Sequence, residues 1–246
     1  MGLTYIKKTT PPSAECAASA PALLLLLHGT GADEHNLLPL IDLVVPPNVV
    51  VASLRAPLNT PFGGYRWFSG YSSAPDPAAL RSEIGASCDE VFAFIEAAPS
   101  TLGTDPDRVY LLGFSQGATT VWTALLSRWP RAGLISGALA LSGRLMPDLK
   151  KPGTPLGARL APAAQLATTR VFASHGGADD VTPLRMGLQN VEHFTAWLGE
   201  EAAASTLTWR EYEHDGHEIG AGAVRDAKAW LAAELAIYIN PVECSR

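Results

Sequence analysis

The sequence has few cysteines and fewer basic than acidic residues, and both shortages exclude classes of protein. Cys16, Cys88 and Cys244 are odd in number and widely spaced, so they predict neither a disulfide framework nor a paired metal-binding motif. Lysine and arginine number 18 against 24 aspartates and glutamates, which gives a formal net charge of −6. Proteins that bind nucleic acid usually carry a basic patch, and none is visible, so we expect no nucleic-acid partner.

Long hydrophobic runs are also missing. The apolar stretch of residues 20–27 is far shorter than the roughly 20 residues that a membrane-spanning helix needs. It is followed by His28 and Gly29 instead of the small-residue cleavage site of a secretion signal. The sequence therefore predicts a cytoplasmic protein with no membrane span.

What the chain does contain is an alternation of two patterns. Short apolar runs, typical of strands buried on both faces of a parallel sheet, alternate with longer segments of helical spacing. The predicted strands are residues 22–28, 48–54, 107–114, 133–143, 169–176 and 206–213, and the predicted helices are residues 77–98, 116–129, 183–201 and 218–239. The alternation predicts one α/β domain over residues 1–246, with a doubly wound, mostly parallel sheet and helices on both faces.

A Gly-x-Ser-x-Gly motif stands at residues 113–117, where a predicted strand ends and a predicted helix begins. This is the setting of a nucleophile elbow, in which a tight turn exposes a serine at the carboxyl end of a strand. Glycine serves at the flanking positions because the turn tolerates little side chain. The motif therefore predicts Ser115 as a nucleophile, against the alternative of an ordinary glycine-rich turn.

A serine hydroxyl needs a base, and the base needs a carboxylate that orients it. In a sheet of this kind the acid and then the histidine follow the serine along the chain. Asp179 and Asp180 come after one predicted strand, and His214 and His217 come after the last. We expect one residue of each pair to complete a catalytic triad with Ser115.

Spacing favours one histidine but leaves the acid open. His217 is preferred over His214 because it lies beyond Gly216, where a loop can turn its imidazole toward the serine. One of the two aspartates could instead cap the helix that begins near Pro183. The same histidines and aspartates, with His175, match no tight metal-ligand motif, so we expect no metal.

The leucine run of residues 23–27 predicts a buried strand that leads into a working loop. An acyl-transfer site needs backbone N–H groups that point at the developing oxyanion. One comes from Gln116, the residue after the nucleophile, and the other comes from a glycine-rich loop after an earlier strand. We expect Thr30 as this second donor, with Gly31 as the next candidate, and we expect His28 to form structural hydrogen bonds.

Five motifs together resemble one known family: "LLLLHGTGADEHNLLPL", "GGYRWF", "GFSQGA", "HGGADDVTP" and "HDGHEI". They are similar to the phospholipase/carboxylesterase family of α/β-hydrolases, which includes acyl-protein thioesterases. The resemblance implies an α/β-hydrolase fold with Ser115 as nucleophile and His217 as base. The family's acid stands four residues after the histidine of a His-Gly pair, which implies Asp179. Family members often carry proline where this chain has Asp180.

Two long loops, residues 55–76 and 144–168, are expected to flank the substrate cleft, and the second is too short for a large lid domain. Four aromatic residues of the first loop either wall an apolar pocket or pin the loop to the core, namely Phe62, Tyr65, Trp67 and Phe68. We expect a cofactor-independent serine carboxylesterase that binds small-molecule esters of short to medium chain length.

Three alternatives stay open. An acyl-protein thioesterase or a lysophospholipase would use the same triad. A serine peptidase of the same fold is disfavoured because the usual large accessory domain is missing. A catalytically silent binding protein would commonly have lost a triad residue, and none is lost here. The prediction also allows a homodimer.

Overall fold

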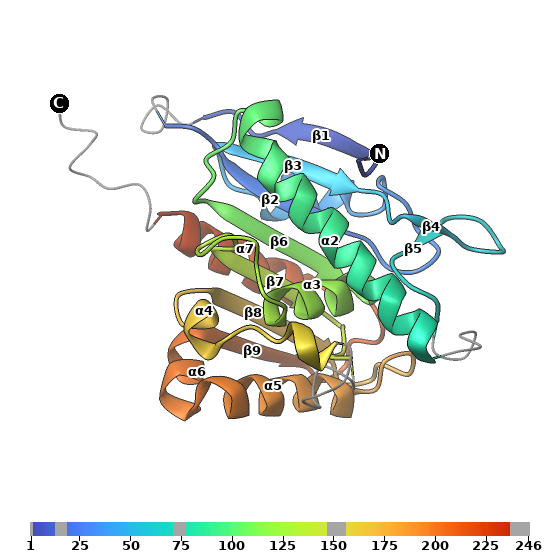
Figure 1. Cartoon of the computed structure of the whole chain (residues 1–246). Coiled ribbons are helices and arrows are strands. Elements are labelled where there is room, and N and C mark those ends of the chain that lie inside the picture. The colour runs from blue at the N-terminus through green and yellow to red at the C-terminus, as the bar shows by residue number, and fades with distance from the viewer. Residues whose placement is uncertain (1, 13–18, 71–76, 147–155, 237–246) are drawn as a thin grey trace.

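A computed structural model describes residues 2–12, 19–70, 77–146 and 156–236 (Figure 1). Its centre is a seven-stranded sheet in the order β1-β3-β2-β6-β7-β8-β9. The strands are β1 (Tyr5–Thr9), β2 (Ala22–Leu27), β3 (Val49–Leu54), β6 (Val109–Phe114), β7 (Gly137–Leu141), β8 (Arg170–Gly176) and β9 (Leu207–Tyr212). All neighbouring pairs are parallel except β1 with β3. The carboxyl ends of six strands therefore meet at one edge.

The leucine run explains why two core layers form. All six residues of β2 are buried, since the strand is covered on both faces and lies between β3 and β6. Successive side chains of a strand point to opposite faces. Leu23, Leu25 and Leu27 accordingly join one apolar cluster, whereas Leu24 and Leu26 join the other.

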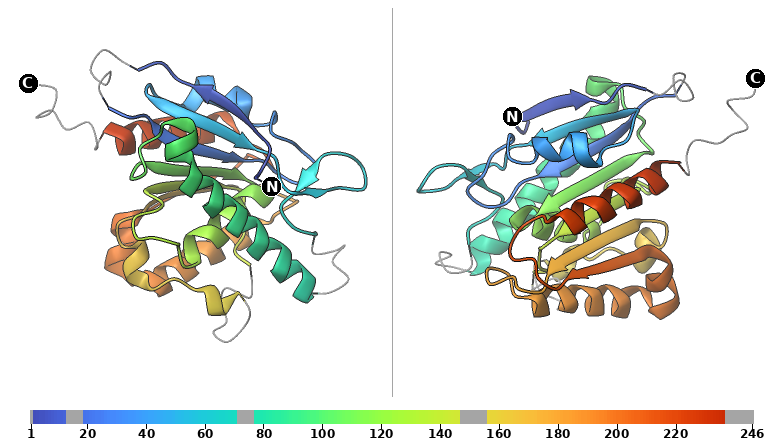
Figure 2. Two further views of the ribbon diagram at one scale, coloured as in Figure 1. Left: turned by 45° about the horizontal axis from the view of Figure 1, so that its top comes forward. Right: turned by 180° about the vertical axis from the view of Figure 1, so that it is seen from behind.

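Helices cover both faces, as the alternation of patterns predicts. They are α1 (Ile41–Val44), α2 (Pro77–Leu102), α3 (Gln116–Leu126), α4 (Ala163–Leu166), α5 (Leu184–Leu198), α6 (Glu200–Thr206) and α7 (Ala221–Ala236), with single 3₁₀ turns at Leu38–Leu40 and Gly157–Arg159. Helices α2 and α3 lie over the face seen in Figure 1, and α1 and α7 lie over the opposite face (Figure 2). The predicted doubly wound, mostly parallel architecture is confirmed.

The differences from the predicted elements have local causes. Strand β1 is almost entirely exposed, so it has no apolar run that could have indicated a strand. The segment predicted as one helix over residues 183–201 is divided at Gly199, whose φ of 84° lies in the left-handed region that favours glycine. Helix α2 continues through Pro99 to Leu102, beyond the predicted end at residue 98.

The two long loops differ in what the structure describes. Residues 55–76 include a small hairpin of β4 (Leu58–Asn59) and β5 (Tyr65–Arg66), and residues 71–76 lie outside the described parts. Of residues 144–168, the stretch 147–155 is likewise outside. Among the described helices, none combines the length and apolar content that crossing a membrane requires.

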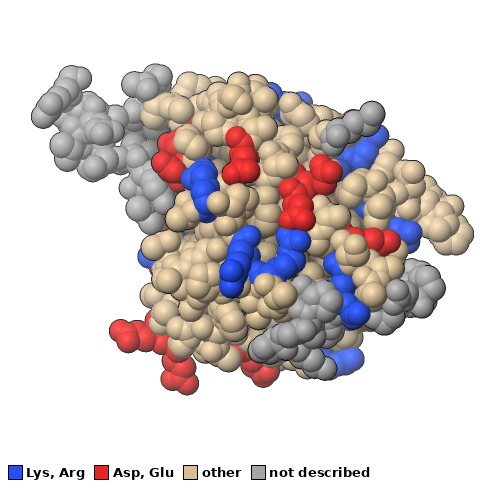
Figure 3. Space-filling model, viewed as in Figure 1, with Lys and Arg blue, Asp and Glu red and all other residues tan. Residues whose placement is uncertain are grey.

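Charges are mixed on the face that carries α2. Figure 3 shows basic and acidic side chains next to one another there. Arg159 forms an ion pair with Asp89 of α2, with one N–O distance of 3.1 Å between Nη1 and Oδ2. Both partners are partly exposed, so the pair contributes little to stability.

Candidate active site

Ser115 stands on the tight turn between β6 and α3. Its backbone angles, φ 54° and ψ −115°, are uncommon for a residue with a side chain. The backbone N–H of Ser115 donates to Leu141 O at 2.9 Å, which ties the turn to the end of β7. Strain of this kind persists only where the surroundings impose it, and it clusters at functional sites.

The two glycines of the motif are required by close backbone contacts. A Cβ at Gly113 would come within 2.5 Å of the Gly117 carbonyl carbon, across the turn. A Cβ at Gly117 would overlap the carbonyl oxygen of Leu27 at the end of β2. The Gly-x-Ser-x-Gly spacing therefore lets α3 begin directly against the ends of two neighbouring strands.

A chain of two hydrogen bonds joins residues from three distant turns. The hydroxyl of Ser115 lies 2.8 Å from His217 Nε2, and His217 Nδ1 lies 2.7 Å from Asp179 Oδ2. With the proton on Nδ1, that nitrogen donates to the carboxylate and Nε2 accepts from the serine. The Asp179 side chain has no exposed surface, whereas 15% of the His217 side chain is exposed.

Of the two candidate aspartates, the structure brings only Asp179 to the histidine. Its other oxygen, Oδ1, accepts from the backbone N–H groups of Val181 at 3.0 Å and Thr182 at 2.7 Å. Asp180 is exposed to solvent, and so is His214. The carboxylate is thus held by its own turn with one oxygen left for the imidazole.

His175 lies beside this carboxylate, a contact that the sequence reasoning missed. Its Nε2 donates to Thr182 O at 2.6 Å and lies 3.4 Å from Asp179 Oδ2. Burial lowers the pKa of His175, although the Thr182 carbonyl and Asp179 act in the opposite direction. No group of three metal-ligating side chains gathers anywhere in the described parts of the chain. The sequence signal for His175 was its place before glycine at the strand end, which did not reveal its partners.

The loop after β2 runs beside the serine. A Cβ built on Gly29 would lie 3.3 Å from the Ser115 Cβ. The amide of Gly31, the next candidate for an oxyanion donor, is already bonded to Tyr65 O at 2.9 Å. Within the described residues, the amides of Thr30 and Gln116 form no hydrogen bond. These two amides are therefore available, and Gly31 is not.

His28 has the structural hydrogen bonds that the sequence reasoning expected. Its Nε2 accepts from the Ala56 N–H at 3.1 Å, and its Nδ1 donates to Gly29 O at 2.7 Å. Burial lowers the pKa of His28, which keeps the ring neutral in this arrangement.

The four aromatic residues of the first loop lie in three different settings. Phe62 is fully exposed, at the hairpin tip. Trp67 and Phe68 belong to the core, with 0% and 2% of their surface exposed. A side chain without exposed surface cannot touch a substrate unless it moves, so these two support the loop.

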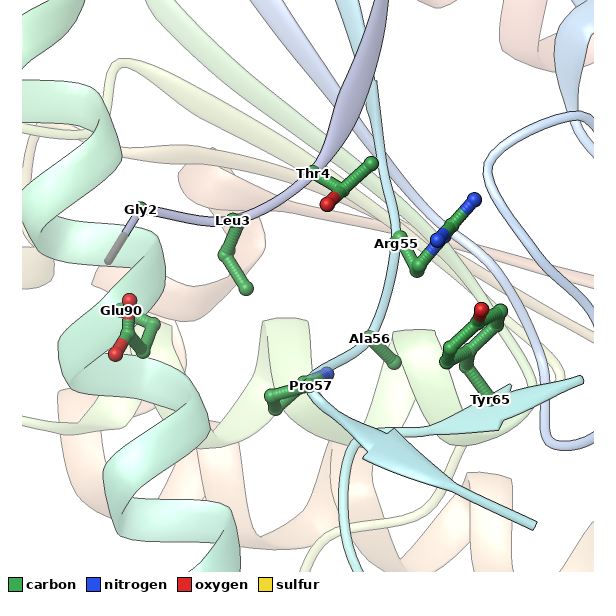
Figure 4. A pocket seen from close by; sticks show the side chains of 8 residues that line it. All are labelled: Gly2, Leu3, Thr4, Arg55, Ala56, Pro57, Tyr65 and Glu90. Atoms are coloured by element: carbon green, nitrogen blue, oxygen red, sulfur yellow. The ribbon is translucent and has the colours of Figure 1, made fainter.

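Tyr65 is partly buried and lies against a side cavity. The Arg55 guanidinium lies 4.5 Å from the centre of its ring. The cavity, of about 290 Å³, lies between the amino-terminal segment, this pair and Glu90 of α2 (Figure 4). Ser115, Asp179 and His217 do not line it.

Three features define this protein as a member of the α/β-hydrolase class. They are the mostly parallel sheet, the tight turn that carries Ser115, and the hydrogen bonds that link Ser115, His217 and Asp179. The chain belongs to the phospholipase/carboxylesterase family, which it matches over residues 13–235. The chain also resembles a protein of Nocardia uniformis subsp. tsuyamanensis named "Putative esterase NocK", with 28% identity over 142 residues. That alignment covers 58% of this chain and only 37% of the Nocardia protein.

Solved structures share the fold over nearly the whole chain. Esterase PE8 superimposes with a TM-score of 0.73 at 22% identity, covering 95% of this chain and 99% of that one. The Bacillus cereus carboxylesterase gives 0.70 at 21% identity, covering 94% of each chain. Zea mays acyl-protein thioesterase 2 gives 0.69 at 21% identity, covering 96% of this chain and 100% of that one.

Proposed function

We propose that this protein is a serine carboxylesterase that hydrolyses small esters through an acyl-enzyme. The observation that carries the proposal is the hydrogen-bonded chain from Ser115 through His217 to Asp179. Membership of the phospholipase/carboxylesterase family supports an esterase-type hydrolase. Among the known relatives both esterases and an acyl-protein thioesterase share the fold, so the thioesterase is the second candidate.

The chemistry follows from the roles of the three side chains. His217 accepts the proton of Ser115 as the serine oxygen attacks the ester carbonyl, and Asp179 stabilises the imidazolium. The amides of Thr30 and Gln116 hold the oxyanion. The imidazolium then protonates the leaving alcohol, and the acyl group stays on Ser115. Water attacks this ester with His217 again as base, which releases the acid and restores the enzyme.

No step of this cycle needs a cofactor or a metal, because the nucleophile, the base and the electrostatic stabilisation all come from the chain. We expect short- to medium-chain esters, since residues 144–168 are too few for a large lid domain. A cytoplasmic location and a homodimer stay predictions.

A substrate panel tests the proposal. Wild-type protein is assayed on esters of increasing acyl length and on matched thioesters, beside Ser115→Ala. We expect ester hydrolysis that falls off for long chains, and a loss of kcat/KM of about 10⁴-fold or more in the variant. Preference for the thioester of each pair would support the second candidate.

A pair of histidine variants is the matched control. His217→Ala should lose activity to a similar degree as Ser115→Ala, because residues that act as a unit are not additive. His214→Ala, at an exposed position three residues earlier, should keep it. A wild-type protein that neither cleaves esters or thioesters nor is labelled by a fluorophosphonate would contradict the proposal and favour a silent binding protein.

A further inference from the structure

Residues 65–68 contact both loops that carry the candidate oxyanion amides. On one side this segment meets the loop after β2, which contains Thr30. On the other side it meets the first residue of α3, Gln116. Two loops that lie far apart in the sequence are thereby joined by a third.

The side chain of Gln116 makes one of these connections. Its Oε1 accepts from the Trp67 backbone N–H at 2.7 Å, and its Nε2 donates to Phe68 O at 2.7 Å. Both bonds are buried, and the residue is 7% exposed. The amide group therefore satisfies one backbone donor and one backbone acceptor that would otherwise be left unpaired in the interior, at a cost in stability.

The indole of Trp67 makes the second connection. Its Nε1 donates to His28 O at 2.9 Å, at the point where β2 passes into the Gly29 turn. The ring has no exposed surface, and the Trp67 carbonyl accepts from the Ser87 hydroxyl of α2 at 2.5 Å. Trp67 is thus held at its backbone by α2 and at its indole by the end of β2 and the surrounding core.

Backbone pairing makes the third connection. The Gly31 N–H donates to Tyr65 O at 2.9 Å, and the Tyr65 N–H donates to Ala32 O at 2.8 Å. Gly64, with φ of 74°, leaves no room for a side chain, since a Cβ there would overlap the Gly31 carbonyl oxygen. The loop after β2 is therefore held against residues 65–67 along most of its length.

We propose that the side chains of Gln116 and Trp67 are positioning residues that fix the Thr30 and Gln116 amides relative to each other. The inference rests on the proposed function, because only an oxyanion needs both amides at one separation. Donors held in place before the reaction stabilise an oxyanion without reorganisation, and displacements of about 1 Å in a catalytic group are costly. Gln116 thus contributes twice, through its own amide and through a side chain that orients the opposite loop.

The chain supplies a matched control at the other end of α3. The Gln165 side chain also accepts from one backbone N–H, that of Trp129 at 3.0 Å, and donates to one carbonyl, that of Ser127 at 2.8 Å. Ser127 is the capping residue that directly follows α3. The two glutamines form the same kind of clamp, but only one of them lies beside Ser115.

The experiment compares Gln116→Met with Gln165→Met. Each variant removes one accepted and one donated hydrogen bond to the backbone and nearly preserves side-chain volume. Both variants should lose thermal stability, and Gln165→Met should lose less, because its two bonds are only partly buried whereas those of Gln116 are buried. Removing one oxyanion donor typically lowers kcat by 10²- to 10³-fold, and a misplaced donor forfeits part of that, so Gln116→Met should lose about 10- to 100-fold in kcat/KM. Gln165→Met should stay within about twofold of wild type, because its clamp lies remote from the reacting atoms.

A second readout separates positioning from general disorder of the site. The Ser115 oxygen adds to the carbonyl carbon of a trifluoromethyl ketone, His217 takes up the serine proton, and the carbonyl oxygen becomes the oxyanion of a tetrahedral adduct. The corresponding alcohol has no carbonyl and binds without forming an adduct. In Gln116→Met the inhibition constant of the ketone should rise by the factor that kcat/KM falls, and that of the alcohol should change less than about twofold. Trp67→Phe, which keeps an aromatic ring and removes the bond to His28 O, should show the same pattern with a smaller factor.

Three outcomes would overturn the inference. Gln116→Met with wild-type kcat/KM would show that the clamp only stabilises the fold. Equal weakening of the ketone and the alcohol would show a deformed cleft instead of displaced amides. Neither result touches the proposed function, provided that Ser115→Ala is inactive. Identical behaviour of wild type and Ser115→Ala would instead overturn the proposed function, and this inference with it.

Discussion

Two turns at the carboxyl edge of the sheet begin with the same dipeptide, His28-Gly29 after β2 and His175-Gly176 at the end of β8. Both histidines are buried, and burial lowers the pKa of each ring. His28 uses both ring nitrogens, for Gly29 O and the Ala56 N–H. His175 donates from Nε2 to Thr182 O, and its buried Nδ1 has no partner in the described parts of the chain.

The two histidines donate from different ring nitrogens and therefore stabilise segments of different length. Nδ1 of His28 reaches only its neighbour Gly29, so that ring stiffens its own turn and links it to the residue two positions beyond β3. Nε2 of His175 donates to Thr182 O, so that ring ties the two ends of the segment of residues 175–182, the acid turn, which contains Asp179. Neither ring is hydrogen-bonded to the Ser115 hydroxyl, whereas His217 Nε2 lies 2.8 Å from it. One dipeptide thus supports two different loops.

The largest expected effect in this comparison comes from replacing Asp179 in the acid turn. Asp179→Asn should lower kcat by about 10³- to 10⁴-fold, because an amide no longer orients the imidazole or stabilises its charged form. Asp180→Asn, at the exposed neighbouring position, should stay within about twofold of wild type, as surface changes usually have small effects. Steady-state ester hydrolysis measures both variants. Greater loss in Asp180→Asn than in Asp179→Asn would assign the acid to the other residue.

Replacing each turn histidine by phenylalanine sharpens the comparison at the level of stability. His28→Phe leaves the buried Ala56 N–H without a partner, whereas Gly29 O still accepts from the Ala32 N–H at 3.3 Å. His175→Phe frees Thr182 O, which is only partly buried. Since a buried group without a partner costs about 1 to 3 kcal/mol, we expect a loss of that size for His28→Phe and a smaller loss for His175→Phe, whose freed carbonyl is only partly buried. Urea unfolding gives both values, and a larger loss for His175→Phe would break the proposed difference.

Local patterns were enough to predict the main elements of the fold. The six buried residues of β2 and the helical spacing of α2 are each visible in a few adjacent residues, because burial acts on every residue of the run. The glycines around Ser115 were readable for the same reason, since a close backbone contact excludes every side chain at that position. Strand β1 was not predicted, because its residues are mostly exposed and pair with β3 through backbone groups, so they form no apolar pattern.

The contacts of the site depend on partners that sequence spacing does not reveal. Gln116 and Trp67 are 49 positions apart, and His217 and Ser115 are 102 positions apart. Spacing left both aspartates open because they occupy the same turn, and only the fold of that turn buries one and exposes the other. The pattern ranked Gly31 behind Thr30 as an oxyanion donor, and in the structure the Gly31 amide donates to Tyr65 O, a partner that spacing does not indicate.

The smallest expected effect is a change in how stability depends on pH. Burial lowers the pKa of His175 below its ordinary value of 6.5, so below that pH the unfolded chain binds a proton that the folded chain does not. Stability therefore falls as the pH drops below 6.5, by at most about 1.4 kcal/mol per pH unit for one histidine.

His175→Phe removes this contribution to the pH dependence. Its unfolding free energy should therefore fall less steeply with acidification than that of wild type. His214→Asn, at an exposed position, is the matched control for the loss of one histidine. Urea titrations at several pH values measure these slopes. An unchanged slope in His175→Phe would contradict the prediction. It would mean that His175 binds its proton in the folded protein as well, with the charge stabilised by Asp179.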